Sequence, residues 1–143
     1  NSGTATGFGG VVKQVLEDNL NTTVSSTSTT YIASGLSIAI TPANASSKFL
    51  LTLSGGSFGS PSDGTQVNCT FYVDGVEVSD TGPYERHSQS YNGNAYVGHS
   101  AACLHSPATV SAVTYTVYYK TSAGTGHFNV GERAVFTVME IGV

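Results

Sequence analysis

Charged residues are scarce in this chain of 143 residues: they make up 10% of it, against roughly a quarter in an average soluble domain. Five Lys and Arg stand against nine Asp and Glu, which gives a formal net charge of -4 at pH 7. A protein that neutralises the phosphates of a nucleic acid needs a basic surface. The composition therefore argues against a nucleic-acid partner.

Long apolar runs and cysteines are also few. No stretch approaches the roughly 20 apolar residues that cross a bilayer, so we expect no membrane partner. The two cysteines, Cys69 and Cys103, fall on apolar positions of expected strands and could bridge two of them. Two cysteines without a wider framework are not a disulfide signature, and free cysteine behaves as a small buried hydrophobe. We favour free thiols.

The residues that are present indicate an all-β protein. Ser, Thr and Gly number 19, 18 and 17, yet 39% of the chain is hydrophobic, so a core can form. The apolar residues are mostly Val, Ile, Tyr and Phe, which suit a pleated surface, whereas strong helix formers are rare. A chain of this size supports one two-layer core. We expect one domain over 1–143, with 1–9 as an extended N-terminal arm.

Alternating segments separated by turn clusters predict a jelly-roll β-sandwich of about 8–10 antiparallel strands. Asp74-Gly75 is the strongest hairpin signal, and the Ser/Thr run Thr22–Thr30 is either an edge strand or a polar linker. The other expected strands are Gly10–Glu17, Leu36–Ile40, Phe49–Leu53, Val67–Val73, Val76–Val78, Ala95–Leu104, Val110–Tyr119 and Glu132–Ile141.

The last expected strand has no clear solvent face. Apolar residues occupy both parities of Glu132–Ile141, which indicates either a central strand under covering loops or a strand that packs on another subunit. Tyrosines in the preceding strand add amphipathic surface of the kind enriched at interfaces, although core tyrosines would look similar. The candidate subunit-interface residues are Tyr115, Tyr119, Phe136, Met139 and Ile141.

The segment 79–94 carries Gly, Pro, Asn and Ser without periodicity and is predicted to be a projecting loop. It holds the one dense polar and aromatic cluster, and such groups suit sugar or protein surfaces. A merely solvated loop is the competing interpretation. The candidate receptor-binding residues are Tyr84, Glu85, Arg86, His87 and Tyr91.

Catalytic and metal signatures do not stand out. The run 55–59 fits the nucleophile-elbow pattern G-x-S-x-G, but that turn works only between a strand and a helix, so we interpret it as a loop. The histidines, His87, His99, His105 and His127, have no ligand spacing typical of zinc sites. We therefore expect no enzymatic activity, no metal and no cofactor.

Two ends of the sequence resemble a known group of proteins. The pieces Ser28–Tyr31, Gly35-Leu36, Ile40–Pro42 and Ser47-Lys48 with Leu50 are similar to segments of tail-fibre and other virion proteins of tailed bacteriophages, especially marine and cyanobacterial ones. The closing Phe136–Ile141 is similar to how those chains often end. The middle, about 54–109, matches no family that we can name.

This resemblance implies a trimeric jelly-roll head like those of the tumour-necrosis-factor and complement-type domains, with its terminal strands near the symmetry axis. The implied protein is part of the virion, exposed on the particle exterior. Its implied partners are two further copies of itself, other virion proteins and a host-surface receptor, for which we favour a glycan. The alternatives are a capsid decoration or cement protein that binds the capsid lattice, and a carbohydrate-binding β-sandwich module.

Overall fold

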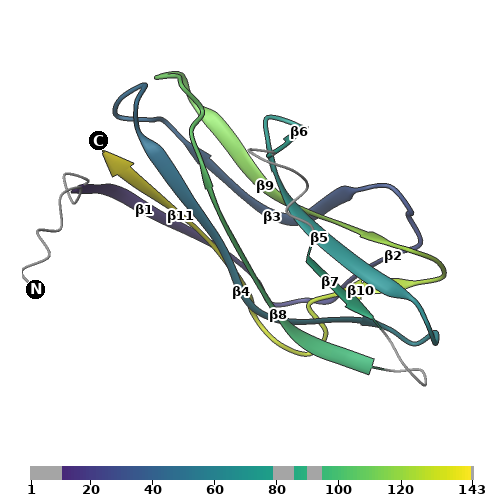
Figure 1. Cartoon of the computed structure of the whole chain (residues 1–143). Helices are drawn as coiled ribbons and strands as arrows, with labels where there is room; N and C mark the ends of the chain where they lie inside the picture. The colour runs from purple at the N-terminus through teal and green to yellow at the C-terminus, as the bar shows by residue number, and fades with distance from the viewer. Residues whose placement is uncertain (1–10, 79–85, 90–94, 143) are drawn as a thin grey trace, which may run out of the picture.

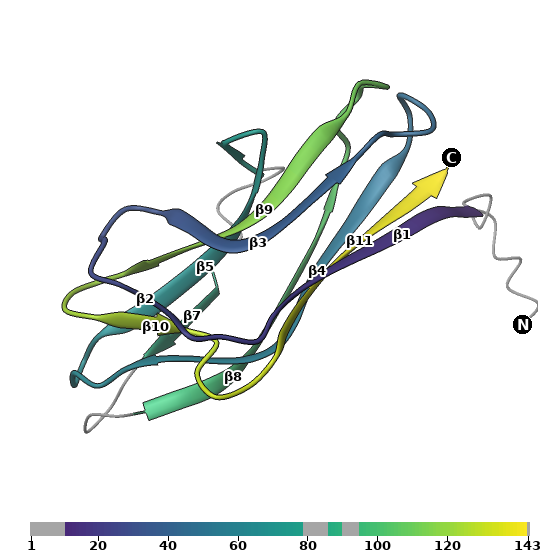
Figure 2. The ribbon, with the colours of Figure 1, turned by 180° about the vertical axis from the view of Figure 1, so that it is seen from behind.

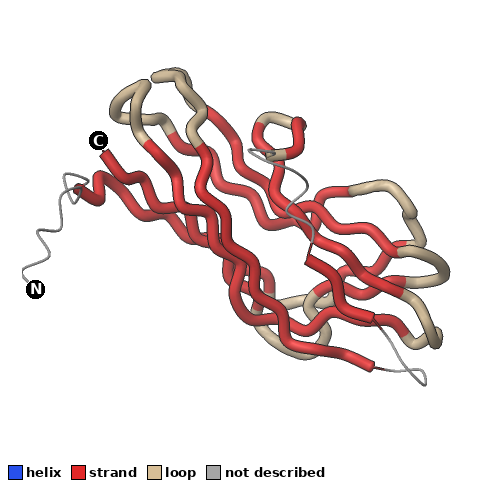
Figure 3. The backbone as a smooth tube through the Cα atoms, in the orientation of Figure 1, coloured by secondary structure: helices blue, strands red, loops and turns tan. Residues whose placement is uncertain are grey.

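A computed structural model describes residues 11–78, 86–89 and 95–142, and all regular structure in these ranges is β-strand (Figures 1 and 3). The expected N-terminal arm lies outside the described residues. The strands are β1 (Val11–Leu20), β2 (Val24–Ser26), β3 (Ile32–Ile40), β4 (Lys48–Ser60), β5 (Gln66–Val73), β6 (Val76–Glu77), β7 (Arg86–Gln89), β8 (Ala95–His105), β9 (Val113–Thr121), β10 (Gly126–Phe128) and β11 (Ala134–Gly142). None of the described residues forms a helix that could span a membrane.

The strands form two antiparallel sheets that pack face to face. In the first, which we call sheet A, β4 is central: β8 pairs with one edge, while β11 and then β10 pair with the other. Strand β1 lies outside β11, and β2 lies outside β10 (Figure 2). The second, sheet B, has the order β3-β9-β5, with β6 and β7 both on the far edge of β5. The all-β sandwich expected from the sequence is confirmed.

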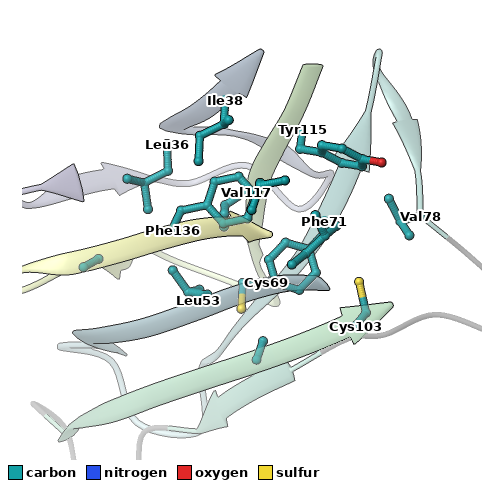
Figure 4. Packing of buried hydrophobic residues seen from close by; sticks show 14 of the residues in the cluster. Leu36, Ile38, Leu53, Cys69, Phe71, Val78, Cys103, Tyr115, Val117 and Phe136 are labelled. Carbon is teal, nitrogen blue, oxygen red and sulfur yellow. The ribbon is translucent and has the colours of Figure 1, made fainter. Parts of the chain in front are cut away.

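The hydrophobic core lies between the sheets and follows the period of two along each strand. In β9 and β11 every second residue is buried, and Phe71 of sheet B stacks on Phe136 of sheet A with ring centroids 5.6 Å apart. Figure 4 shows side chains from both sheets converging on this region. Cys69 and Cys103 are both buried here and form no disulfide, as expected.

Two hydrogen bonds fasten the layers together. The backbone N–H of Ser37 in β3 donates to the Asp18 carboxylate of β1 at 2.9 Å, which joins the two sheets along one edge. At the other edge, the ring Nδ1 of His105 in β8 lies 2.9 Å from the Tyr115 hydroxyl of β9. Each bond links a strand of sheet A to a strand of sheet B and adds to the core packing between the two sheets.

The turn predictions succeeded where the sequence carries a specific turn signal. Asp74 and Gly75 both have positive φ, 48° and 81°, as a two-residue hairpin between β5 and β6 requires. The Ser/Thr run contains the short edge strand β2, which pairs with β10, so the edge-strand interpretation holds there. The segment 79–94 was expected to be a loop, but it contains β7, which pairs with β5. This strand forms through its pairing with β5, because its own sequence has no alternation that would predict a strand.

The G-x-S-x-G run is also not a loop. It lies within β4, at a register shift against β8 between Ser54 and Ser57. Gly55 and Gly56 have φ of 71° and 76°, so β4 bends where its partner changes from β11 to β10. A Cβ on Gly55 would lie 2.5 Å from the carbonyl oxygen of Arg133, so this position needs glycine. The motif is a strand bulge, with no helix after it.

Candidate subunit interface

The outer face of sheet A carries apolar side chains that the sandwich itself does not cover. Because paired residues on neighbouring strands share a face, the register places Val15, Met139, Leu50 and Leu104 in one row across β1, β11, β4 and β8. We call these four residues the outer apolar row. Val12 and Ile141 pair beside it, towards the end of β11.

Exposure shows how much of this face water still reaches. Val12, Val15 and Leu104 are 50%, 51% and 42% exposed, and Leu50, Met139 and Ile141 are partly buried. Together they expose apolar surface on the order of 400 Å², the size of the largest patch on a typical monomer, which is often functional. Sheet A is thus apolar on both faces at this end, which is typical of a surface that meets another protein.

Polar and charged groups frame the outer apolar row. The next row towards the start of β11 carries Glu17, Thr137 and Thr52. Glu17 accepts a hydrogen bond from the exposed Arg133 guanidinium at 3.3 Å. On the other side, Lys48 pairs with Ile141. An apolar centre with a polar rim is the usual anatomy of a protein interface.

A fully buried carboxylate holds the end of sheet A in place. Glu140 points to the inner side of β11 and is 0% exposed. Its Oε2 accepts from the Gln14 side-chain amide at 2.6 Å, and its Oε1 accepts from the backbone N–H of Ala43 at 2.7 Å. The same Gln14 amide donates to the carbonyl oxygen of Thr41 at 2.9 Å. Glu140 therefore ties β1, β11 and the 41–47 loop together directly beneath Ile141 and Met139.

Several donors keep this carboxylate ionised. Burial by itself raises the pKa of Glu140, but hydrogen-bond donation and charge outweigh burial and leave the pKa below its ordinary value. The Ser47 hydroxyl lowers the pKa of Glu140, and the Gln14 amide, the Ala43 N–H and the Lys13 charge lower it further. The anion is thus stabilised inside the fold.

The structure divides the predicted interface residues into two groups. Tyr115, Tyr119 and Phe136 are 0% exposed in the core, so their side chains have no surface to offer a partner, and their assignment to an interface is corrected. The two tyrosines were assigned to an interface because tyrosine is enriched there, and Phe136 because its strand carries apolar residues on both parities. Met139 and Ile141 lie on the outer face, where they stay candidates for subunit contact.

The predicted receptor-binding residues are not brought together by the described part of the structure. Tyr84, Glu85 and Tyr91 lie outside the described residues. The backbones of Arg86 and His87 belong to β7, where they pair with Cys69 and Asn68.

Most members of the outer apolar row were missed by sequence reasoning. Leu50 lies between the core residues Phe49 and Leu51, and Leu104 follows the core residue Cys103. Each is an apolar residue at a position that the alternation of its strand assigns to the solvent face, and this was the signal that could have revealed it. Across the described residues, no group of three or more His, Cys, Asp or Glu side chains is arranged to hold a metal ion.

Comparison with solved structures identifies the same fold in virus particles. A chain from the structure of infectious bursal disease virus, Gx strain, superposes with a TM-score of 0.51 at 12% identity over 91% of this chain and 36% of the viral chain. Chains of the T13 particle of that virus and of its derived T=1 particles give TM-scores of 0.49 and 0.48 at 14% identity. This chain spans about a third of the viral chains. No family model matches the sequence, and no curated protein matches it.

Proposed function

We propose that this protein is a non-enzymatic structural component of a virion, in which copies of the chain associate through the outer face of sheet A. The observation that carries the proposal is the outer apolar row, an exposed apolar surface on a sheet that is already buried on its other face. The fold shared with a chain of a virus particle supports the virion role. The phage resemblance of the two sequence ends supports a trimer at the end of a fibre or spike.

The native mass of the isolated chain, measured by light scattering at several concentrations, tests this association. We expect a trimer for the unchanged protein and a monomer for Leu104→Lys, because a charge in the outer apolar row would have to be desolvated at the interface. Val110→Lys is the matched control, since Val110 is 59% exposed and lies outside the row. Self-association through this row would be refuted if the unchanged protein stays monomeric, or if the Leu104→Lys variant keeps the native mass of the trimer.

Receptor contact through the 79–94 segment belongs to the same proposal. In a virion protein of this kind the segment would face a host-surface receptor, for which a glycan is favoured. Replacing Tyr84 and Tyr91 by alanine should reduce adsorption of the particle to host cells while leaving the native mass unchanged. Undiminished adsorption would remove this segment from the receptor site.

A second candidate function is capsid decoration, in which the outer apolar row binds the capsid lattice instead of further copies of the chain. The breadth of the apolar face favours this candidate over a free-standing carbohydrate module. Here the isolated chain would be monomeric and would bind to isolated capsids, and Leu104→Lys would abolish that binding. Measuring capsid occupancy by co-sedimentation separates the two functions.

A further inference from the structure

The outer face of sheet B carries a group of aromatic rings on the opposite side of the molecule from the outer apolar row. Tyr72 of β5 stacks on Tyr118 of β9 with ring centroids 3.9 Å apart and planes 18° apart. Tyr31, just before β3, meets Tyr72 at 6.0 Å with a tilt of 57°. We call these three residues the tyrosine cluster. All three rings are partly exposed.

The strand register explains why the rings gather. Tyr118 pairs with Thr70, and Tyr72 pairs with Thr116, so the two tyrosines are diagonal neighbours on one face, within reach of large side chains. The Nζ of Lys120 lies 4.3 Å from the centre of the Tyr31 ring, in a cation–π contact that holds this ring in place. The cluster is therefore ordered before any ligand arrives, which lowers the entropic cost of binding.

Hydrogen-bonding groups surround the rings. The hydroxyls of Ser37 and Thr116 lie 3.0 Å apart on the same face. Glu77, which pairs with Tyr72, is partly exposed, and its carboxylate accepts from the buried Thr70 hydroxyl at 3.2 Å. Aromatic rings beside hydroxyl and carboxylate groups match a sugar, which presents apolar C–H faces and a rim of hydroxyls.

Size and charge select the ligand. Three partly exposed tyrosines offer on the order of 200 Å², far below the roughly 800 Å² that each partner contributes to a standard protein interface. They match one or two sugar rings. Among the described residues that face outward here, the cation Lys120 already contacts Tyr31, and the anion Glu77 already accepts a hydrogen bond. The Asp74 carboxylate, which accepts from the Thr114 N–H at 2.8 Å, adds a second anion beside these strands. The described charges therefore disfavour an anionic ligand, which would need cations to offset its charge, and an uncharged ligand fits better.

We propose that the tyrosine cluster is a binding site for a neutral saccharide. The inference deepens the proposed receptor role and rests on it for the source of the saccharide, the host surface. It places the contact on a rigid sheet face in addition to the 79–94 segment.

Native electrophoresis through gels that contain a polysaccharide tests this site. The probes are soluble neutral glucans, mannans, galactans and xylans, with alginate as the anionic counterpart. We expect at least one neutral polysaccharide to retard the unchanged protein, with affinity at least ten-fold weaker for Tyr72→Ala and Tyr118→Ala. Tyr96→Ala is the matched control, because Tyr96 is a 37% exposed tyrosine on β8 of the other sheet. Since the chain has no Trp, tyrosine fluorescence during titration with oligosaccharides of the retarding polymer is a second readout.

The outcomes separate this site from the rest of the proposal. Tyr31→Ala should also weaken retardation. It keeps the test decisive if Tyr72→Ala or Tyr118→Ala fails to fold, because Tyr31 lies before β3 and its replacement alters no strand. Absence of retardation by every neutral polysaccharide, retardation by alginate alone, or equal retardation of the Tyr31, Tyr72 and Tyr118 variants would overturn the saccharide site. A trimer without retardation would leave the structural role standing. A monomer that is retarded would leave the saccharide site standing and refute self-association.

Discussion

Replacing Glu140 by glutamine is the sharpest test of how sheet A is held together. The carboxylate accepts from Gln14 through one oxygen and from the Ala43 N–H through the other. Glutamine keeps the shape but has only one acceptor oxygen, so its NH2 group must face one of these donors. The loss of a hydrogen bond to a charged acceptor costs about 1.5–3 kcal/mol. With a urea m value of about 2 kcal/mol/M, the midpoint of unfolding should fall by roughly 1 M.

The pH dependence of this difference tests its electrostatic origin. A carboxyl whose pKa is lowered on folding contributes stability above its unfolded pKa, about 4.3, and this contribution is lost as the pH falls through the lowered folded pKa. Urea unfolding at fixed protein concentration should therefore show a constant gap between the unchanged protein and Glu140→Gln near neutral pH, and a shrinking gap below about pH 4.5. Glu132→Gln, at an exposed turn, is the control and should change little. A gap that persists unchanged to pH 3, or no gap at pH 7, would refute the reasoning.

Two matched pairs test the backbone and the core. Gly55→Ala should destabilise the protein by about 1–3 kcal/mol more than Gly64→Ala, because both glycines have positive φ but only at Gly55 would the new Cβ meet a backbone oxygen; equal losses in thermal unfolding would argue against the close approach. Tyr119→Phe should be neutral or stabilising by up to about 1 kcal/mol, since the buried Tyr119 hydroxyl has no hydrogen-bond partner among the described residues. Tyr115→Phe should instead cost about 1 kcal/mol, because it removes the bond to His105. The reverse order of these two midpoints in urea would contradict the core described above.

Local sequence signals were sufficient where one residue type decides the backbone. The Asp74-Gly75 pair predicted its hairpin because few other dipeptides adopt two consecutive positive φ values. The alternation in Leu36–Ile40 predicted which side chains are buried, since the pleat sends successive residues to opposite faces. The run 55–59 failed as a predictor because the same glycines serve a loop or a strand bulge, and only the partners of β4 distinguish the two.

The candidate surfaces were less accessible to sequence reasoning. Met139 and Ile141 were identified from the apolar residues on both parities of the last strand, but Leu50, Leu104 and Val15 join them only through cross-strand register. The tyrosine cluster was invisible for the same reason, because its three members come from separate parts of the chain. Sequence alone offers no measure of which residues become neighbours across a sheet.

The sequence by itself determined the all-β class and the positions of most strands, because β-branched and aromatic residues with a period of two specify a half-buried pleated surface. Only the tertiary structure decided which parity faces the core in strands that carry apolar residues on both, such as β11. That choice made Tyr115, Tyr119 and Phe136 interior residues and left Met139 on the surface. The physical reason is that both parities of a strand can bury apolar side chains, and what covers each face comes from elsewhere in the chain or from another molecule.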